Sequence, residues 1–337
     1  MKQYLDLLDN ILTKGTVKKD RTGIGTISIF GTDLRFNLQE GFPLVTTKRL
    51  YYKGILHELL WFLGNHMKDP KYNRLSMTNI KYLVDNDVNI WNEWPYDKFC
   101  KTYHPNIVKY SDEWKQTLEL FKEDIKNNFE FAKEHGNLGP VYGKQWVNFE
   151  GLRKGILTSV NQIDIVINTL KTNPDSRRIM LNAWNPVEIP DMALDPCHYG
   201  FQCISVEMND DEKNKYLDGL PIDEHFKFPR KLSLKFNMRS IDTFFGLPFN
   251  IASYAYLTHM LAEQTHHIVD ELIFSGGDTH IYLNLVDQVK EQLKRTPYEL
   301  PKILMNKNVS SIYDYKYEDF EIQDYKYHPA IKGQIAV

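Results

Sequence analysis

The segment Asp195-Pro196-Cys197-His198-Tyr199-Gly200-Phe201-Gln202 places a cysteine directly after a proline, at the start of an alternating stretch. Residues 201–207 alternate Phe, Cys and Ser with Gln, Ile and Val, which is typical of a strand with one buried face. Cys197 is either a small buried residue, the commoner role of a lone cysteine, or a nucleophile at the mouth of this strand. His198 should point to the opposite face, which disfavours a Cys-His pair of the cysteine-protease kind.

The chain around this strand mixes helical and strand patterns. Residues 231–238 alternate again and predict the second strand of a hairpin, with the polar residues 208–230 as its long loop. Intermixed helices and antiparallel hairpins predict an α+β fold with one main domain over residues 1–337. Other expected elements are helices over 2–14, 50–63, 162–170, 248–265 and 281–295, and strands over 26–30, 33–37, 178–184 and 271–275, with a turn at 31–33.

Two polar segments interrupt this pattern. Residues 64–78 contain Asn, Lys, Asp and Pro and predict a loop. Residues 96–135 are rich in Lys, Asp and Glu, with helical spacing of apolar residues over 114–125. We expect both segments, together with 208–230, to be surface insertions, because such excursions fit outside a core at little cost.

The composition limits the classes of function. The 337 residues carry a formal net charge of -3 and no basic stripe, so nucleic acid is not an expected partner and an anionic ligand needs a local cluster of Arg or Lys. The three cysteines, Cys100, Cys197 and Cys203, form no CxxC pair, which predicts neither a disulfide framework nor a zinc site. The chain starts without the apolar core of a signal peptide and has no apolar run that could span a bilayer. We therefore expect a cytoplasmic protein without a metal and without membrane contact.

Arginines beside serine hydroxyls form the candidate anion sites. Arg177 and Arg178 follow Ser176, and Arg239 precedes Ser240. A guanidinium binds phosphate oxygens in a bidentate way, and near a thiol it would also favour the thiolate. The alternative is a solvated pair of charges, which is the usual fate of adjacent arginines.

Glu58 lies within the apolar stretch Ile55-Leu56-His57-Glu58-Leu59-Leu60-Trp61-Phe62. A carboxylate among such neighbours is costly unless it is paired, so Glu58 is a candidate for proton transfer. Alternatively, it faces solvent or pairs with His57. Trp91 and Trp94 are either core aromatics or a stacking wall for a flat ring.

Asn250, His280 and Tyr282 are further candidate binding residues. Asn250 lies at the start of a long apolar helix, where its amide suits a pyrimidine edge or caps the helix. His280 and Tyr282 are two residues apart, so on a strand they face the same side. They bind sugar hydroxyls or are ordinary buried groups.

Nine segments follow one another along the chain: Asp20–Gly25, Phe42–Arg49, His57–Leu63, Gly139–Trp146, Asp175–Arg178, Pro196–His198, Arg239–Asp242, Gly246–Tyr254 and Gly277–His280. In content and order they resemble the thymidylate synthase family over nearly the full length. The resemblance implies a mixed sheet with surrounding helices, and a homodimer in which two sheets pack back to back.

The resemblance also implies a reaction and a set of site residues. Deoxyuridylate (dUMP) would be attacked at C6 by Cys197, and C5 would then receive a one-carbon unit from 5,10-methylenetetrahydrofolate. The implied catalytic residues are Cys197, Glu58, Tyr142, Asn250 and Arg239. The implied nucleotide contacts are Arg21, Gln202, Arg239, Ser240, Asp242, Asn250, His280 and Tyr282, with Arg177 and Arg178 donated by the other subunit. The implied folate contacts are Lys48, Ile90, Trp91, Trp94, Asp242, Gly246, Phe249 and Ala336, with the C-terminal residues 336–337 closing over the ligands.

The chain departs from the family pattern at Asn137, at Met238, at Phe245 and over Cys203-Ile204-Ser205, but no departure removes a catalytic group. Two alternatives remain open from the sequence. A deoxyuridylate hydroxymethylase shares the cysteine and the folate but lets water capture the methylene. A catalytically silent nucleotide- or RNA-binding homologue is disfavoured by intact Cys197, Glu58 and Tyr142.

Overall fold

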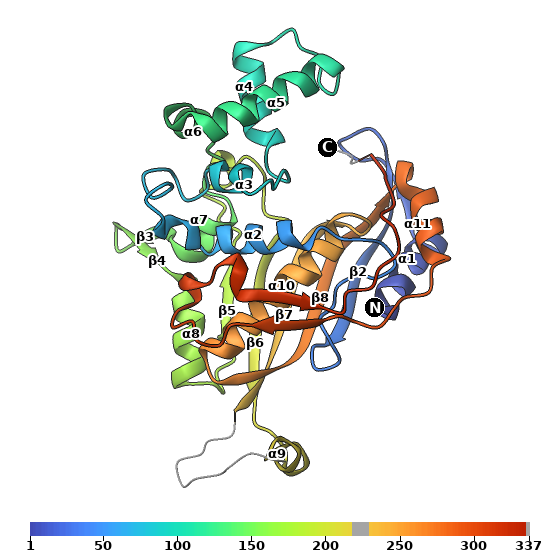
Figure 1. Ribbon diagram of the computed structural model, residues 1–337, viewed down its shortest axis with the longest axis vertical. Coiled ribbons are helices and arrows are strands. Elements are labelled where there is room, and N and C mark those ends of the chain that lie inside the picture. Colours follow the sequence, from blue (N-terminus) through green and yellow to red (C-terminus); the bar gives the residue numbers. More distant parts are fainter. Residues whose placement is uncertain (218–228, 335–337) are drawn as a thin grey trace.

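A six-stranded mixed sheet forms the centre of the computed structural model, which describes residues 1–217 and 229–334 (Figure 1). Parallel pairing occurs between β7 and β8, whereas the other neighbours pair antiparallel. This arrangement confirms the predicted α+β class. In spatial order the strands are β1 (Thr16–Lys18), β2 (Thr26–Asn37), β8 (His267–Tyr282), β7 (Arg230–Asp242), β6 (His198–Val206) and β5 (Met180–Asn182).

The prediction of two strands with a turn at 31–33 is wrong, because β2 is one strand. Phe30 pairs with Asp278 and Thr32 pairs with Gly276, so the register against β8 is the same on both sides of Gly31. Gly31 has a φ of 83°. Glycine adopts this left-handed conformation without steric penalty, so the strand changes its local backbone conformation here without reversing direction.

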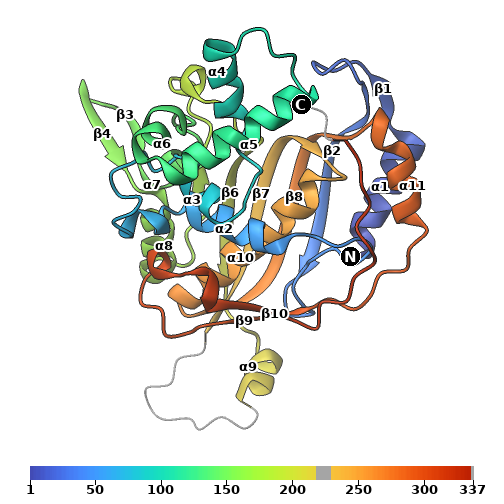
Figure 2. The same cartoon turned by 45° about the horizontal axis from the view of Figure 1, so that its top comes forward.

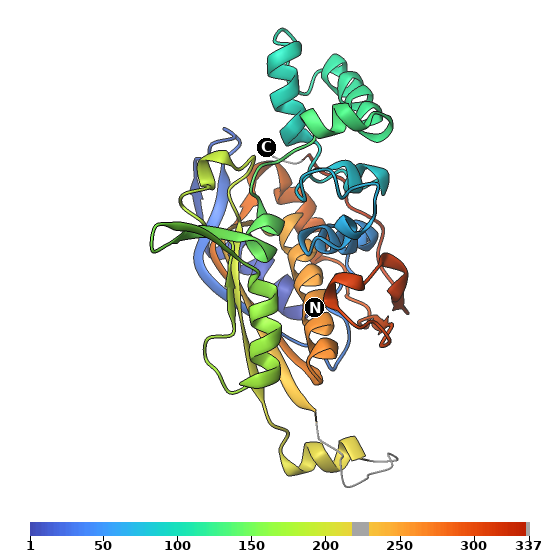
Figure 3. The ribbon, with the colours of Figure 1, turned by 90° about the vertical axis from the view of Figure 1, so that its left-hand side faces the viewer.

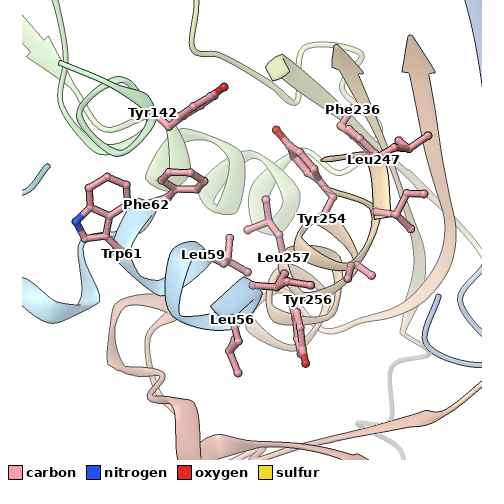
Figure 4. Packing of buried hydrophobic residues seen from close by; sticks show 14 of the residues in the cluster. Leu56, Leu59, Trp61, Phe62, Tyr142, Phe236, Leu247, Tyr254, Tyr256 and Leu257 are labelled. Carbon is pink, nitrogen blue, oxygen red and sulfur yellow. The ribbon is translucent and has the colours of Figure 1, made fainter. Parts of the chain in front are cut away.

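One face of the sheet is covered by α10 (Gly246–Gln264), and α2 (Tyr52–Phe62) packs beyond it (Figures 2 and 3). Both helices are buried over most of their circumference because they lie between other layers. Tyr254 of α10 stacks on Phe236 of β7 with ring centroids 4.3 Å apart. Figure 4 shows how leucines and aromatic rings of the two helices interdigitate. The predicted helices 50–63 and 248–265 are therefore confirmed, and α1 (Lys2–Lys14) matches the predicted 2–14.

The segment 96–135 forms helices that extend from one end of the molecule (Figure 1). Ser111 caps α5 by accepting a hydrogen bond from Trp114 N at 3.1 Å. The buried Lys81 holds the other end of α5, since its Nζ donates to the Lys126 carbonyl at 2.5 Å. The predicted loop 64–78 consists of turns and a short 3-10 helix, Asn65–Lys68. The helices at this end are α3 (Lys81–Asp85), α4 (Glu93–Tyr103), α5 (Asp112–Asn127) and α6 (Phe129–His135).

Strands β6 and β7 pair antiparallel, which confirms the predicted hairpin. The connection is not only loop, however, because α9 (Asp210–Leu217) lies in it, and residues 218–228 are outside the described part of the chain. The C-terminal helix starts later than the predicted 281, because β8 extends to Tyr282. The remaining elements are α7 (Tyr142–Val147), β3 (Phe149–Arg153), β4 (Ile156–Val160), α8 (Gln162–Thr172), α11 (Val286–Leu293), β9 (Lys302–Met305) and β10 (Phe320–Gln323).

The opposite face of the sheet presents side chains to solvent at its β5–β6 edge. Met180 is 55% exposed and Ile204 is 57% exposed. The predicted strand 178–184 is thus shorter than expected, and alternates between buried and exposed residues at the sheet edge.

Among the described residues, no helix combines the length and the apolar character needed to cross a bilayer.

Candidate active site

Cys197 lies directly before β6, where two other elements hold its backbone. Its N–H donates to the Tyr142 hydroxyl at 2.7 Å, and its carbonyl accepts from Arg239 N at 2.8 Å. Tyr142 is the first residue of α7, and Arg239 lies on β7. The sheet register shifts between His198 and Gly200, so the ladder is irregular directly after the cysteine. This irregularity lets the strand present Cys197 at its end instead of burying it within the ladder.

Neighbouring groups shift the pKa of the Cys197 thiol in opposite directions. Burial raises the pKa of its thiol, the Arg239 guanidinium lowers it, Asp195 raises it and Arg21 lowers it, with a net increase. The two arginines therefore partly offset the loss of hydration. Both were predicted from the sequence as phosphate ligands, and their proximity to the thiol supports a shared site.

Arg239 is fixed by contacts that the sequence did not reveal. Its Nε donates to the Pro196 carbonyl at 2.9 Å, and its Nη2 donates to the Asp195 carbonyl at 3.1 Å. The guanidinium carbon also lies 5.5 Å from the centroid of the Trp184 ring, within cation–π range. These contacts hold the guanidinium beside the turn that carries Cys197.

His198 points away from Cys197, as predicted. Its Nδ1 is 2.8 Å from the Tyr254 hydroxyl, and its ring stacks on Tyr142 with centroids 3.9 Å apart. Burial lowers the pKa of His198 to about 3. It is therefore neutral at physiological pH and positions Tyr142 by stacking.

Glu58 neither faces solvent nor pairs with His57, so both alternative interpretations are wrong. It is 9% exposed, and its Oε1 accepts a hydrogen bond from Trp91 Nε1 at 2.7 Å. Burial raises the pKa of Glu58 to about 7, although the Trp91 hydrogen bond lowers it. Glu58 is also among the charges that raise the pKa of Tyr142. The fold thus places a carboxyl group that titrates near neutrality close to Tyr142.

An aromatic and apolar wall continues from Glu58. The ring centroids of Trp91 and Trp94 are 5.3 Å apart, and Trp91 lies 5.9 Å from Tyr142. Ile90 is 39% exposed next to them, and Phe249 of α10 is half-buried. Trp91 is only 4% exposed, which favours the core alternative for this ring, and its hydrogen bond to Glu58 was not predicted. Trp94 is half-buried beside it.

Asp242, not Asn250, holds the turn that leads into α10. Its Oδ1 accepts from Phe244 N at 2.8 Å and Phe245 N at 3.3 Å. The helix begins at Gly246, so Asn250 is its fifth residue and the alternative role as N-cap is wrong. Asn250 is half-buried, and its amide has no hydrogen-bond partner among the described residues. The amide is thus available for a ligand.

His280 and Tyr282 contact each other on β8, with ring centroids 5.1 Å apart, so the predicted common face is confirmed. Burial raises the pKa of Tyr282, and Asp242, Asp20, Arg21 and Cys197 are the charges that influence it. Tyr282 therefore lies within electrostatic range of both the cysteine and the N-terminal turn. In that turn Asp20 accepts from Thr22 N at 3.0 Å and Gly25 N at 2.8 Å, which leaves Arg21 exposed. Ser240 is half-buried beside Arg239 on β7.

The remaining predicted site residues lie elsewhere. Arg177 and Arg178 are exposed just before β5, and Gln202 is exposed on β6 and donates to the Arg177 carbonyl at 3.1 Å. Lys48 is 3% exposed, with its Nζ 3.3 Å from the Phe244 ring centroid, and burial lowers its pKa to about 7. Ala336 lies outside the described residues, together with the expected closure of the C-terminus.

A family model described as thymidylate synthase matches residues 2–337. The chain belongs to the thymidylate synthase family. Proteins named thymidylate synthase from Mycoplasma mobile, Malacoplasma penetrans and the aster yellows witches'-broom phytoplasma are 49%, 44% and 44% identical to it, each over the whole of both chains. These relatives therefore share the full length of the chain, including the regions that we expected to be insertions.

Membership of the thymidylate synthase family confirms the resemblance drawn from the nine segments. It also gives the enzyme class, because thymidylate synthases are methyltransferases. In residues 1–217 and 229–334, no three His, Cys, Asp or Glu side chains gather closely enough to hold a metal ion.

Proposed function

We propose that this protein is a thymidylate synthase that converts dUMP into thymidylate (dTMP), with 5,10-methylenetetrahydrofolate as its co-substrate. The observation that carries this proposal is the placement of Cys197 between Tyr142 and Arg239, with Glu58 nearby. One strand end thus brings together a nucleophile, a cation that favours its ionised form and two groups for proton transfer.

The nucleotide would be held from three directions. Arg21, Arg239 and Ser240 offer donors for the phosphate, since guanidinium groups bind phosphate oxygens in a bidentate way. The unpartnered amide of Asn250 suits uracil, which presents an acceptor next to an N–H donor. His280 and Tyr282 would hold the ribose hydroxyl. These contacts place C6 of the base within reach of Cys197.

Proton balance defines the roles of the other groups. The Cys197 thiolate forms a bond to C6, and the electron pair of the C5–C6 double bond moves onto the C4 carbonyl as an enolate. C5 then forms the bond to the incoming carbon and must lose its proton. Tyr142 is the proposed acceptor at C5, and Glu58 exchanges protons at the base through water. Once the added carbon has received hydride, the C6–Sγ bond breaks, its electron pair returns to sulfur and Cys197 leaves as the thiolate. The pKa of Glu58, about 7, suits transfer in both directions.

The residues present fit a reduced folate. The half-buried Trp94, supported by the buried Trp91, offers a ring for stacking on a pterin, and Ile90 is exposed beside them. Asp242 uses Oδ1 for the turn before α10 and leaves Oδ2 for a pterin N–H. Bound there, the folate supplies the one-carbon unit and the hydride. Proposed further contacts are Gly246, Phe249, Ala336 and Lys48, although Lys48 would have to leave Phe244 to reach the folate tail.

We further propose a cytoplasmic homodimer in which the uncovered sheet face packs against its symmetry mate. The exposed Met180 and Ile204 on that face support this arrangement. Arg177 and Arg178 lie at the same edge, and neither has an acidic partner in the described part of the chain. In a two-fold dimer these arginines could complete the phosphate site of the partner subunit, with Gln202 bracing the backbone of Arg177.

The direct test is to incubate the protein with dUMP and 5,10-methylenetetrahydrofolate and to weigh the nucleotide product. We expect dTMP, together with an equal amount of dihydrofolate followed by its absorbance. A product heavier than dTMP by one oxygen, formed without dihydrofolate, would instead identify a hydroxymethylase.

A further inference from the structure

A pocket separate from the Cys197 site lies between α2, the segment that follows it and the C-terminal residues 313–318. Its volume is about 620 Å³, within the range of about 300–1,000 Å³ that is usual for small-molecule sites. None of the residues assigned above to the nucleotide or the folate lines it. The pocket is therefore not part of the proposed active site.

Aromatic rings form its walls. His57 and Tyr317 are stacked, with centroids 4.8 Å apart and planes 6° from parallel. His66 and Tyr72 both pack against Tyr82, at 5.0 Å and 5.5 Å. Such a lining favours a flat ring over a flexible or spherical ligand, because flat rings gain most from stacking and edge contacts.

Three buried polar atoms around this pocket have no hydrogen-bond partner among the described residues: His57 Nε2, His66 Nδ1 and Asn65 Oδ1. His57 and His66 are only 4% and 6% exposed. The Asn65 amide is oriented by its Nδ2, which donates to the Ile312 carbonyl at 3.1 Å and the Tyr315 carbonyl at 2.9 Å. An unsatisfied buried polar group destabilises a fold, so the gathering of three around one pocket points to a ligand that pairs with them.

The charge of the pocket disfavours an anion. Lys68 forms an ion pair with Asp314, and the lining also holds Lys316, Asp69 and Glu318, so its acids outnumber its lysines. Burial lowers the pKa of both His57 and His66 to about 4, so neither ring carries a charge at pH 7. A phosphate would find no net positive charge there.

We propose that this pocket binds a neutral planar heteroaromatic molecule, such as a nucleobase or an unphosphorylated nucleoside. The aromatic lining would contact its faces and edges. Its donor and acceptor atoms would pair with the imidazole nitrogens of His57 and His66 and with the Asn65 carbonyl oxygen. Because these atoms lie just beneath the pocket surface, binding includes a small rotation of the overlying rings.

Adenosine is a suitable probe, because it is planar, carries donor and acceptor atoms on one edge and lacks a phosphate. Its binding would be followed by saturation-transfer NMR and calorimetry, with and without saturating dUMP. We expect a dissociation constant in the millimolar range or below that dUMP does not change. Tyr317→Ala should weaken binding at least tenfold, whereas Tyr317→Phe, which keeps the ring, should retain it.

The matched control is Tyr298→Ala. Tyr298 also stacks on a histidine, His328, with centroids 4.8 Å apart, but it does not line the pocket. Binding should survive this change, and circular dichroism should show that all three variants are folded. The proposal is overturned if adenosine does not bind, if dUMP displaces it, or if Tyr317→Ala leaves its affinity unchanged. None of these outcomes depends on turnover, so they leave the proposed reaction untouched.

Discussion

At the scale of single residues, burial sets the pH at which Glu58 ionises. A carboxyl group with an ordinary pKa would be charged throughout the physiological range, whereas the pKa of Glu58 is raised to about 7. The unfolded chain then ionises Glu58 at lower pH than the folded chain does. The neutral carboxyl group therefore adds to the stability of the fold below the pKa that Glu58 has in the unfolded chain. This contribution is lost as the pH rises through 7.

We therefore expect Glu58→Gln to stabilise the protein at pH 8 by up to about 3 kcal/mol, and by much less at pH 5. Glutamine keeps an acceptor for Trp91 Nε1 without the buried charge. Urea unfolding of both proteins at the two pH values provides the measurement, with the exposed Glu299→Gln as control. Equal shifts at pH 5 and pH 8 would contradict the raised pKa. Turnover should fall strongly, since the amide cannot transfer protons.

The reactivity of Cys197 should depend on Arg239. Removing its guanidinium takes away the largest charge effect that lowers the pKa of the thiol. In a background with Cys100 and Cys203 replaced by alanine, Arg239→Ala should shift the iodoacetamide reaction of Cys197 to higher pH. The exposed Arg153→Ala on β3 should cause no shift. An unchanged profile for Arg239→Ala would mean that another group controls the thiol.

The sequence predicted residue types better than residue pairs. Cys197, Glu58 and Asn250 could be selected because each is chemically unusual in its local stretch. The Trp91–Glu58 hydrogen bond and the packing of Trp184 on Arg239 could not, because they join segments 33 and 55 positions apart. The turn that Asp20 stabilises could be predicted from the local sequence, because an aspartate two residues before a threonine and five before a glycine favours such a turn.

At the scale of elements, helix α5 depends on one buried lysine. Lys81 Nζ donates to the carbonyls of Ile125 and Lys126 at 3.2 Å and 2.5 Å, and forms an ion pair with Asp85 at 3.2 Å. A cation at a helix C-terminus satisfies carbonyls that have no partner within the helix. Asp85 keeps a second partner, Lys71, at 2.8 Å.

Lys81→Met should therefore release α5 without leaving Asp85 unpaired. We expect a loss of about 2–4 kcal/mol, concentrated in the segment 112–135, because buried carbonyls lose their donor. Hydrogen exchange of backbone amides would detect faster exchange there than in the sheet. The neighbouring exposed Lys126→Met serves as control and should leave the exchange unchanged. Uniformly faster exchange across the whole chain would argue against a local anchor.

The sequence predicted where a helix or strand begins and ends only where pairing or packing with other elements did not change it. The apolar spacing over residues 2–14 was sufficient to place α1. The division of β2 failed, because Gly31 carries a local turn signal that the pairing with β8 overrides. Likewise, the polar composition of 208–230 indicated a loop, although local propensity suffices for a helix over Asp210–Leu217.

At the scale of the whole molecule, donation of Arg178 across a dimer can be tested by complementation. Cys197→Ser and Arg178→Ala proteins should each be inactive. After subunit exchange at equal amounts, half of the dimers are mixed and each has one intact site, so about a quarter of the wild-type activity should return. Dilution assays must first show that subunits exchange. If they exchange and activity stays absent, the arginine acts within its own subunit.

The pairing of β2 with β8 also has a consequence for how the chain is made. Strand β2 ends at Asn37, and the strand beside which it lies begins at His267. At about 5–20 residues per second, a ribosome needs about 10–50 s to produce the intervening chain. During that time, of the described strands only the three-residue β1 can pair with β2, which therefore presents an open edge. A nascent chain stalled at residue 265 should therefore be cleaved by protease within residues 26–37, whereas the completed and released chain should be protected there.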